Sequence, residues 1–330
     1  MTLKPTLILL DAFFSTDFIV LYPLLKGSQT EVVVIQTMLS TYNEGVLPPL
    51  NTGLIPGQDS PQTIQGAWKR YYRNRALWRA WQTIKYIGQN PDRLVRRKFR
   101  QNNLLSTYRL RDDKVFHVGF DNLPEWIMAP REFDFPERQV LSYQKYLGVM
   151  VDLTRTEDLP PTYLTLMERI AQERQANLNL KLLYVSLGTV KGAHAKTRDL
   201  QRFFKRLFEA VGTQPHWQVI IAVGPDLKDS LTKCPSNIYM LAWVPQLHLL
   251  QHCDLFITHG GLNSVLEGWT LEVPMLVYPL NYAWDQMGNA ARVVSQGKGL
   301  LGDFRNDSAG RINQAIRQLL IKCPICSKIQ

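Results

Sequence analysis

The sequence predicts an α/β protein with two domains, each built on a parallel β-sheet. The chain of 330 residues is long enough for two domains of ordinary size. Short apolar segments of strand length alternate with helical segments along most of the chain, which is typical of parallel βα units. A polar stretch that ends in two prolines, residues 148–161, interrupts this alternation. We therefore expect a first domain over residues 1–160, a linker over 161–180 and a second domain over 181–330.

The first domain is the less regular of the two. Aliphatic and β-branched residues predict three strands, at residues 6–10, 31–35 and 115–119. Proline and glycine predict a loop at 48–61, and arginine-rich segments at 68–86 and 93–105 are interpreted as helices.

The apolar N-terminal stretch, residues 7–25, is interpreted as a buried strand that runs into a helix. It contains Asp11 and Asp17, follows a single lysine and has no small-residue cleavage site. These features argue against a signal peptide or a membrane span. The four cysteines include one close pair, in CPIC at 323–326, and a lone C-x-x-C is a weak zinc or redox signal. We therefore expect no metal site and a cytoplasmic protein with reduced thiols.

The second domain is more regular, and its βα alternation predicts a doubly wound sheet. Strands are expected at Lys181–Ser186, 218–223, Ile238–Leu241, Leu255–Thr258 and 275–278. Helices are expected at 196–211, 247–251, 262–269, 284–296 and 308–321. In sheets of this kind ligands bind at the carboxyl ends of the strands, so the residues that follow each strand are the candidates for a binding site.

The positive charge of the chain is concentrated in one segment, residues 67–114. This segment carries 14 basic and 3 acidic residues, a net charge of +11 against +10 for the whole chain. Aromatic residues alternate with these charges, which suits docking on an anionic membrane surface and a hydrophobic or lipid-like acceptor. No nucleic-acid motif accompanies the segment, so we do not expect nucleic-acid binding. The alternative is a solvated helix face whose aromatic residues turn to the core.

A strand end, two glycines and a helix start follow one another in the sequence FITHGGLNSVLEG. Gly260 and Gly261 allow the backbone to approach a ligand closely, and the start of a helix offers free N–H groups and a partial positive charge. His259, Asn263 and Ser264 add side-chain donors. The combination predicts a phosphate site. The alternative is a structural strand-to-helix turn in which Ser264 caps the helix.

Other polar and aromatic positions supply contacts for a nucleoside and a sugar. Glu267, one turn inside the same helix, predicts an acceptor for ribose hydroxyls, or else compensation of the helix dipole. Trp243 lies just past a strand and is interpreted as a stacking surface for a base, with a place in the core as the alternative. Asp285 and Gln286 begin the next helix and are predicted to bind sugar hydroxyls, or else to form an ordinary first turn.

Together these residues resemble the donor-site signature of the family-1 UDP-glycosyltransferases. The matching positions are Trp243-x-Pro245-Gln246, His259-Gly260-Gly261-x-Asn263-Ser264-x-x-Glu267, Pro274, Pro279, Asp285-Gln286 and Asn289-Ala290. Upstream, the segment Ser186-Leu187-Gly188-Thr189 resembles the S-x-G-[ST] turn of the family's second domain. The resemblance implies a GT-B fold, in which two Rossmann-like domains face each other and the second holds most of the UDP-sugar.

The resemblance also implies a role for each residue. The implied roles are stacking on uracil for Trp243, ribose binding for Gln246 and Glu267, diphosphate binding for His259, Asn263 and Ser264, and sugar binding for Asp285 and Gln286. It further implies inverting transfer without a metal or another cofactor, because backbone dipoles and a histidine stabilise the departing diphosphate. The UDP-sugar is then a donor substrate.

One part of the family pattern is not found. The family begins with a strand, a glycine turn and a histidine that acts as general base, which a carboxylate further along the chain orients. Asp11 matches the orienting aspartate, whereas none of the six histidines lies in a matching context. The family also continues beyond the last predicted helix. We therefore expect an incomplete first domain and a second domain whose last helix is missing.

Three functions are compatible with these residues. The first is transfer of a hexose from a UDP-sugar to an acceptor hydroxyl. The second is a remnant that binds a nucleotide-sugar without turnover, because the base is missing. The third is a GT-B epimerase acting on a UDP-sugar, which the Trp-x-Pro-Gln and Asp-Gln motifs fit less well.

Overall fold

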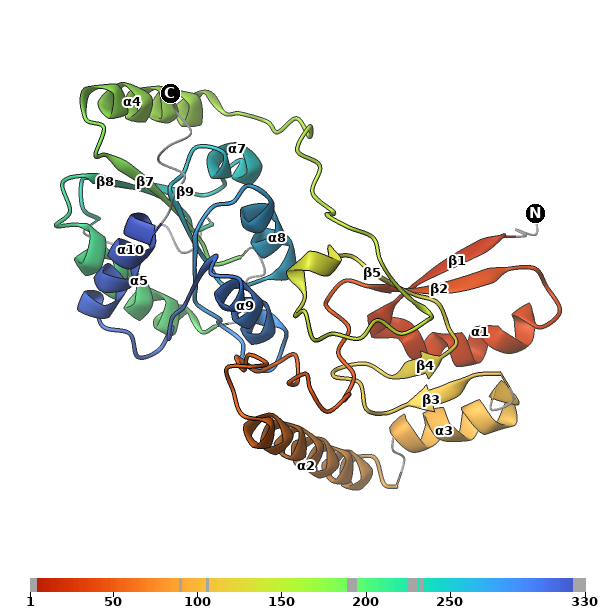
Figure 1. Cartoon of the computed structure of the whole chain (residues 1–330). Helices are drawn as coiled ribbons and strands as arrows, with labels where there is room; N and C mark the ends of the chain where they lie inside the picture. Colours follow the sequence, from red (N-terminus) through yellow and green to blue (C-terminus); the bar gives the residue numbers. More distant parts are fainter. Residues whose placement is uncertain are drawn as a thin grey trace. The chain divides into compact units, whose positions relative to one another are not determined.

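The protein consists of two compact units. The computed structural model describes residues 5–88, 91–104, 107–188, 195–224, 231 and 234–322. Residues 1–150 form unit 1 and residues 151–330 form unit 2, each with its own parallel sheet (Figure 1). Most of the segment that we expected to be a linker, residues 161–180, is helix α4 (Pro161–Ala176). A proline at the start of a helix is favourable because its missing N–H has no partner there, so Pro161 starts this helix rather than breaking it.

Unit 1 contains a four-stranded parallel sheet in the order β1-β2-β5-β6. Its strands are β1 (Leu7–Asp11), β2 (Glu31–Gln36), β5 (Glu125–Ile127) and β6 (Gln144–Tyr146). Its helices are η1 (Ala12–Asp17), α1 (Phe18–Leu25), α2 (Pro61–Lys85), α3 (Pro91–Gln101) and η3 (Arg131–Phe133). Strands β3 (Arg109–Arg111) and β4 (Gly119–Asp121) form a separate antiparallel pair.

The predicted strands at 6–10 and 31–35 are confirmed to within one residue. Both arginine-rich helices are present, but α2 begins seven residues earlier than expected and α3 ends four residues earlier. The predicted strand at 115–119 is wrong. Only its last residue, Gly119, belongs to a strand, and residues 115–117 form bends. Phe116 has φ of +69°, a left-handed conformation that interrupts an extended backbone. Apolar residues at 115–118 therefore belong to a turn rather than to the sheet.

A buried network of polar side chains fills the interior of unit 1. Its centre is the carboxylate of Glu125, which accepts hydrogen bonds from Lys114, Gln36, Ser40 and Gln144. Lys114 and Glu125 are both almost completely buried and form an ion pair. Burial opposes ionisation of Glu125, but Lys114 and the surrounding donors hold its pKa below the ordinary value. Each charge of the pair is therefore stabilised by the other, because water does not reach the buried groups to solvate them.

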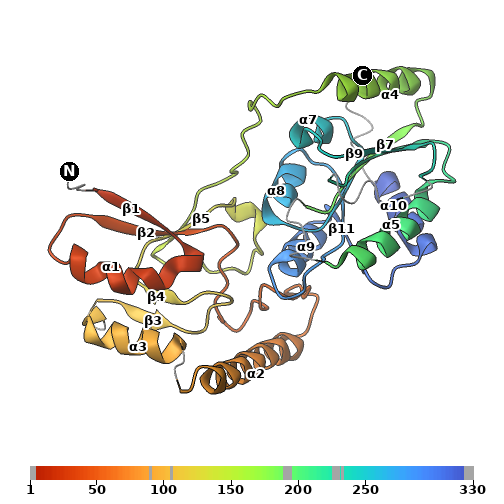
Figure 2. The same cartoon turned by 180° about the vertical axis from the view of Figure 1, so that it is seen from behind.

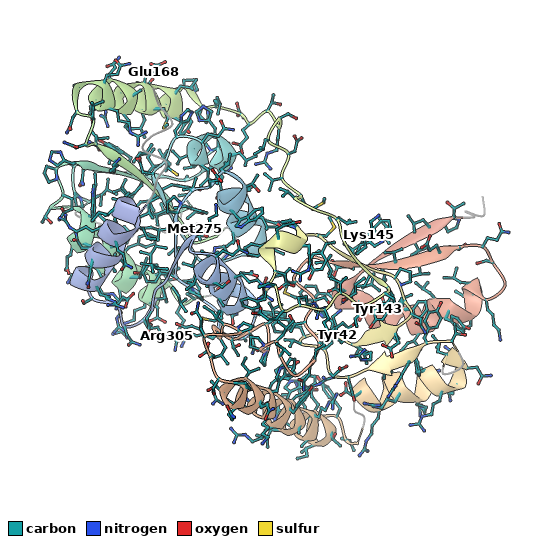
Figure 3. All side chains as sticks on the ribbon, viewed as in Figure 1. Tyr42, Tyr143, Lys145, Glu168, Met275 and Arg305 are labelled. Atoms are coloured by element: carbon teal, nitrogen blue, oxygen red, sulfur yellow. The ribbon has the colours of Figure 1, made fainter. Side chains whose placement is uncertain are left out.

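Two tyrosines lie beside this network. Tyr42 and Tyr143 are close together in Figure 3, and the Tyr42 hydroxyl lies 3.5 Å from Oε2 of Glu125. The ammonium group of Lys114 lies 5.2 Å from the centre of the Tyr42 ring. Burial raises the pKa of Tyr42 well above its usual value, so its hydroxyl stays protonated and can donate a hydrogen bond to the carboxylate.

Unit 2 contains a six-stranded sheet in the order β12-β11-β10-β7-β8-β9, and all neighbouring strands are parallel. Its strands are β7 (Lys181–Ser186), β8 (Trp217–Ala222), β9 (Ile238–Leu241), β10 (Leu255–Thr258), β11 (Met275–Val277) and β12 (Gly299–Leu301). Its helices after α4 are α5 (Thr197–Val211), α7 (Gln246–Leu250), α8 (Leu262–Thr270), α9 (Gln286–Ser295) and α10 (Ala309–Lys322). Every strand and helix predicted for this unit is present, with ends shifted by about two residues or less.

Helices cover both faces of this sheet (Figures 1 and 2). Helices α5 and α10 cover one face, and α7, α8 and α9 lie on the other. Phe203, Leu207 and Val211 of α5 recur at helical spacing and are buried against the first face. Met275, labelled in Figure 3, is fully buried on the second face, where its sulfur approaches Gly268 of α8. The α/β fold with two parallel-sheet units is therefore confirmed.

The buried ion pair of unit 1 gives a stability prediction. Replacing Lys114→Met leaves the Glu125 carboxylate buried without a counter-charge, and we expect the free energy of unfolding to fall by about 3–5 kcal/mol. Chemical denaturation measures this loss. The double substitution Lys114→Met/Glu125→Leu removes both charges and should recover part of it. A single variant that loses less than about 1 kcal/mol would show that water reaches the pair.

Candidate functional site

The strand order of unit 2 creates a switch point in the sheet. Numbered along the chain, its six strands lie in the order 3-2-1-4-5-6 once β7 is counted as the first. Strands β7 and β10 are therefore neighbours whose following segments leave the sheet in opposite directions. In the β7–β10 register Ser186 pairs with Thr258, so the residues after both strands emerge side by side. Open α/β sheets bind their ligands at this position.

Two glycines enclose the imidazole of His259 at the switch point. A Cβ atom added to Gly188, after β7, would lie 2.9 Å from Cε1 of His259. One added to Gly261, before α8, would lie 2.7 Å from Nε2 of the same ring. Gly188 also has φ of +89°, which other residues rarely adopt. Glycine is thus required at both positions to leave room for the His259 ring.

Gly260 makes the turn between His259 and helix α8. Its φ is +90°, and a Cβ there would lie 2.9 Å from Cγ1 of Val277 and 3.0 Å from the carbonyl oxygen of Gln286. The side-chain amide of Asn289 donates a hydrogen bond of 2.9 Å to the Gly260 carbonyl. This turn therefore depends on backbone packing against β11 and α9.

Helix α8 begins at this turn without a side-chain cap. Gly261 is the residue before the helix and, as a glycine, it has no side chain that could cap the first turn. Asn263 is exposed and Ser264 is half-buried. The first N–H groups of a helix lack intrahelical partners and carry a partial positive charge, which favours an anion. The predicted phosphate-binding residues therefore converge on one uncapped helix start.

The structure brings Gln246 and Glu267 together, as the predicted ribose site requires. The side-chain amide of Gln246, at the start of α7, donates to Oε2 of Glu267 at 2.5 Å and to Oγ of Ser264 at 3.3 Å. The hydroxyl of Tyr184 in β7 donates to Oε1 of Gln246 at 3.0 Å. Because each partner is oriented by another, the carboxylate of Glu267 is held in a defined position next to the helix start.

Arg155 and Glu157 also belong to this network, and the sequence analysis did not single them out. The guanidinium of Arg155 lies 2.9 Å from Oε1 of Glu157 and 3.7 Å from Oε1 of Glu267. Glu157 accepts the backbone N–H of His248 in α7 at 2.9 Å. Burial raises the pKa of Glu267, whereas the hydrogen bond from Gln246 and the charge of Arg155 lower it. The segment that precedes α4 therefore contributes a charge to the predicted ribose site.

Trp243 lies between β9 and α7, just beyond the carboxyl end of the sheet. Its side chain is 53% exposed, so the alternative of a core tryptophan is ruled out. Three residues later the chain reaches Gln246, which contacts Glu267. An exposed indole next to this network has the form of a stacking surface.

Asp285 and Gln286 lie at the start of α9, but their side chains differ in role. Gln286 is almost fully buried, and its Oε1 accepts the backbone N–H groups of Leu280 and Asn281 at 2.8 and 2.9 Å. Oδ2 of Asp285, which is half-buried, accepts from Asn289 at 3.0 Å. The amide oxygen of Gln286 therefore braces the β11–α9 loop, while Asp285 lies nearer the surface.

Two of the predicted site residues lie elsewhere or outside the described residues. Thr189 is outside them, as are Cys323 and Cys326 of the CPIC motif. Asp11 lies at the end of β1 in unit 1, where its Oδ1 accepts the backbone N–H of Phe13 at 2.8 Å and caps η1. In this place it acts as a helix-capping residue.

The structure places one histidine, His117, near Asp11. The His117 ring packs edge-on against Phe13 with ring centres 4.4 Å apart. Burial and the charge of Lys114 lower its pKa to about 4, and the charge of Asp11 partly opposes this. The imidazole is therefore neutral at pH 7 and is a weak base. The sequence showed no link between positions 11 and 117.

The described part of the chain contains neither a cluster of metal-ligating side chains nor a membrane-spanning helix. Among those residues there is no group of three or more histidine, cysteine, aspartate or glutamate side chains that could hold a metal ion. None of the helices described is long and apolar enough to cross a membrane.

Comparison with known proteins points to one family. Residues 205–326 match the family model of the C-terminal domain of erythromycin biosynthesis protein CIII-like proteins. The chain is 31% identical over 150 residues to the NDP-glycosyltransferase YjiC of Bacillus subtilis (strain 168), which is 45% of this chain and 36% of that protein. It is 33% identical over 130 residues to the oleandomycin glycosyltransferase of Streptomyces antibioticus, 39% of this chain and 28% of that protein. The chain thus spans about a third of these relatives.

Solved structures show the fold over almost the whole chain. The kitacinnamycin glycosyltransferase superposes with a TM-score of 0.60 and 18% identity, covering 98% of this chain and 69% of that one. The spinosyn rhamnosyltransferase SpnG complexed with thymidine diphosphate gives a TM-score of 0.55 and 16% identity, covering 96% and 65%. Sheet order, switch-point turn and these matches define a GT-B glycosyltransferase fold. Over the matched part of unit 2, the chain is similar to glycosyltransferases of this family.

The bracing role of Gln286 can be tested by its effect on stability. We expect Gln286→Met to lower the free energy of unfolding by about 1–3 kcal/mol, because two buried backbone N–H groups lose their acceptor. The measurement is denaturant-induced unfolding. Asp285→Asn, at the neighbouring half-buried position, is the control and should change stability by less than about 1 kcal/mol. Equal stability of the Gln286 variant and the parent would contradict a bracing role.

Proposed function

We propose that unit 2 binds a UDP-sugar and that the chain transfers its hexose to an acceptor hydroxyl with inversion. The observation that carries this proposal is the His259-Gly260-Gly261 turn, which lies at the switch point of the sheet and opens into an uncapped helix. Because the chain spans about a third of its curated relatives, their names support the proposal without establishing the activity of this chain.

The diphosphate fits the start of α8. Free N–H groups of Asn263 and its neighbours in the first turn, together with the helix dipole, favour two adjacent phosphates. The ring of His259 is fixed between Gly188 and Gly261, so it is oriented before a ligand arrives. Preorganised donors cost little reorganisation when negative charge develops on the leaving group.

The nucleoside fits the positions on either side of Gln246. Glu267 offers a carboxylate to a ribose diol, and Gln246 holds that carboxylate in place. Trp243 offers an exposed indole to the base. A carboxylate acceptor favours a ribose with both of its hydroxyls, so we expect UDP to bind more tightly than thymidine diphosphate.

The transfer is a single displacement at the anomeric carbon. The acceptor oxygen forms a bond to C1 of the sugar from the face opposite the diphosphate. The bond from C1 to the phosphate oxygen breaks, and its electrons leave with UDP. The proton of the acceptor hydroxyl passes to a base on the acceptor side. Negative charge on the departing diphosphate is stabilised by the α8 N–H groups and His259, which supports transfer without a metal ion.

The sugar lies next to the start of α9 in this proposal. Asp285 is half-buried there and offers carboxylate oxygens to hydroxyl groups. Gln286 contributes by holding the loop from Leu280 to Asn281 in place through its amide oxygen. The two residues of the Asp-Gln motif thus serve sugar binding in different ways, one by contact and one by positioning.

A second function, donor binding without turnover, is favoured by one observation on the acceptor side. His117, the histidine near Asp11, has a pKa of about 4 and is a poor general base at neutral pH. Release of UDP from UDP-glucose in the presence of acceptor alcohols, measured with and without a chelator, separates the two functions. Turnover that survives the chelator supports metal-independent transfer, and UDP binding with no turnover supports the second function.

Donor binding gives the next prediction. UDP should raise the melting temperature of the protein, because it binds the native state. Glu267→Ala should weaken UDP binding by about 1–3 kcal/mol, since a buried ribose hydroxyl loses its acceptor. Calorimetry measures the affinity. Glu272→Ala, just after the end of the same helix, is the control and should leave the affinity unchanged. If both variants bind UDP as the parent does, Glu267 is not in the site.

The contact between Arg155 and Glu267 predicts a pH dependence. Ribose hydroxyls need an ionised Glu267, whose pKa burial raises, so UDP affinity should fall as the pH drops through that raised pKa. Arg155→Gln removes the opposing positive charge and leaves the negative charge of Glu157 facing Glu267. The loss of affinity should then begin at a higher pH, by a modest amount because Arg155 is partly exposed.

Affinity for UDP measured across the acidic range tests this expectation. Arg155→Lys keeps the charge and should preserve the profile of the parent. Superimposable profiles for all three proteins would show that Arg155 does not influence the ionisation of Glu267.

A further inference from the structure

A face of helix α2 in unit 1 carries large apolar side chains that are turned to solvent. The residues are Leu77, Trp78, Trp81 and Ile84 of the helix together with Tyr86 and Ile87, which follow its last residue, and we refer to them as the α2 apolar face. Trp78 and Trp81 are 51% and 52% exposed, and Ile84 and Ile87 are 79% and 94% exposed. Positions 77, 81 and 84 recur at helical spacing, so these side chains form one stripe. A stripe of this size on a solvated helix marks a surface that meets an apolar partner.

The aromatic residues of the basic segment divide into two groups. Trp68 and Phe99 are buried, and the Trp68 indole donates to the carbonyl of Leu47 at 2.8 Å. Trp78 and Trp81 are about half exposed. The alternative that the aromatics of this segment turn to the core therefore holds for the first group but not for the second.

The charges around the α2 apolar face are positive. Helix α2 contains no acidic residue, and the three aspartates of segment 67–114 are each paired with arginine. The pairs are Asp92 with Arg79, Asp112 with Arg75 and Arg96, and Asp113 with Arg111. Exposed basic residues on α2 and α3 are Lys69, Arg70, Arg73, Lys85, Arg93, Arg97, Lys98 and Arg100. The three aspartates therefore neutralise only the arginines with which they pair. The exposed surface of α2 and α3 carries a net positive charge.

Lys85 connects the charge with the apolar face. Its ammonium group lies 4.8 Å from the centre of the Trp81 ring and 5.1 Å from the centre of the Tyr86 ring. This arrangement places an ammonium group, two aromatic rings and the aliphatic side chains of Ile84 and Ile87 in neighbouring positions of the chain. The same three kinds of group are favoured at a bilayer interface. Aromatic rings prefer the headgroup level, aliphatic side chains prefer the acyl region, and ammonium groups meet lipid phosphates.

We propose that the α2 apolar face and the flanking basic residues of α2 and α3 dock on an anionic phospholipid surface. Charge complementarity selects this occupant, because each basic residue near an anionic membrane contributes favourably to binding. A nucleic acid would interact favourably with the basic residues and the aromatic rings. It would gain little from the exposed aliphatic side chains of Leu77, Ile84 and Ile87. In Figure 2 helices α2 and α3 lie at the periphery of unit 1.

Docking of this kind is independent of the donor site. The α2 apolar face belongs to unit 1, whereas the proposed UDP-binding residues belong to unit 2. A variant that loses membrane binding should therefore keep its thermal stabilisation by UDP. Conversely, failure of the UDP experiments would leave this proposal standing.

The test is flotation of the full chain with vesicles of phosphatidylcholine, with and without phosphatidylglycerol. We expect binding only to the anionic vesicles and a marked loss at high salt, because screening weakens the attraction. The variant Trp78→Ser/Trp81→Ser/Ile84→Ser should bind at least about tenfold more weakly, since it loses three apolar side chains that would leave water on docking. The variant Lys85→Gln/Arg93→Gln/Arg97→Gln should show a similar loss and a weaker salt dependence.

Matched controls separate this surface from exposed apolar residues in general. Val20→Ser/Leu24→Ser alters side chains of α1 that are exposed to a similar degree, and this variant should bind vesicles as the parent does. Circular dichroism verifies that each variant is folded. Absence of binding to anionic vesicles at low salt, or equal loss in the α1 control, overturns the proposal. So does tighter binding to a single-stranded oligonucleotide than to the vesicles.

Discussion

The packing of one imidazole between two glycines determines the geometry of the candidate site. Parallel pairing of β7 and β10 sets Ser186 opposite Thr258, so the turns after both strands lie side by side. Gly188 and Gly261 then approach the His259 ring so closely that neither position accepts a Cβ atom. The direction of the ring and the place where α8 begins follow from this contact. A ligand at this point meets donors that the backbone has already aligned.

Two sets of polar contacts surround this turn. One set binds backbone groups, and the other orients a side chain. Asn289 and Gln286 bind backbone groups of the glycine turn and of the β11–α9 loop. Gln246 binds the carboxylate of Glu267, and Tyr184 orients Gln246. The first set maintains the shape of the site. The second set orients a side chain that faces the position proposed for the ribose.

Much of unit 2 could be predicted from the sequence because its apolar strands and amphipathic helices are long and regularly spaced. The strand-to-helix turn at residues 259–261 could be predicted because its residues follow one another at a strand end, and its role in phosphate binding stays a prediction. Arg155 could not, because a charged residue in a polar segment carries no periodic signal and its contact with Glu267 spans more than a hundred positions. The strand expected at 115–119 does not form because Phe116 has a left-handed backbone conformation, which the apolar composition of the segment does not reveal. The sequence predicted one role, sugar binding, for both Asp285 and Gln286. The structure separates them because Gln286 is buried and Asp285 is half-buried.

In the proposed function the start of α8 binds the diphosphate of a nucleotide while Trp243 stacks on its base. The most direct measurement is a nuclear magnetic resonance titration of the amide-labelled full chain with UDP. We expect the largest shifts on the backbone amides of Gly261, Asn263 and Ser264 and on the indole N–H of Trp243. Binding of UDP that left these four signals in place and moved only residues of unit 1 would contradict it.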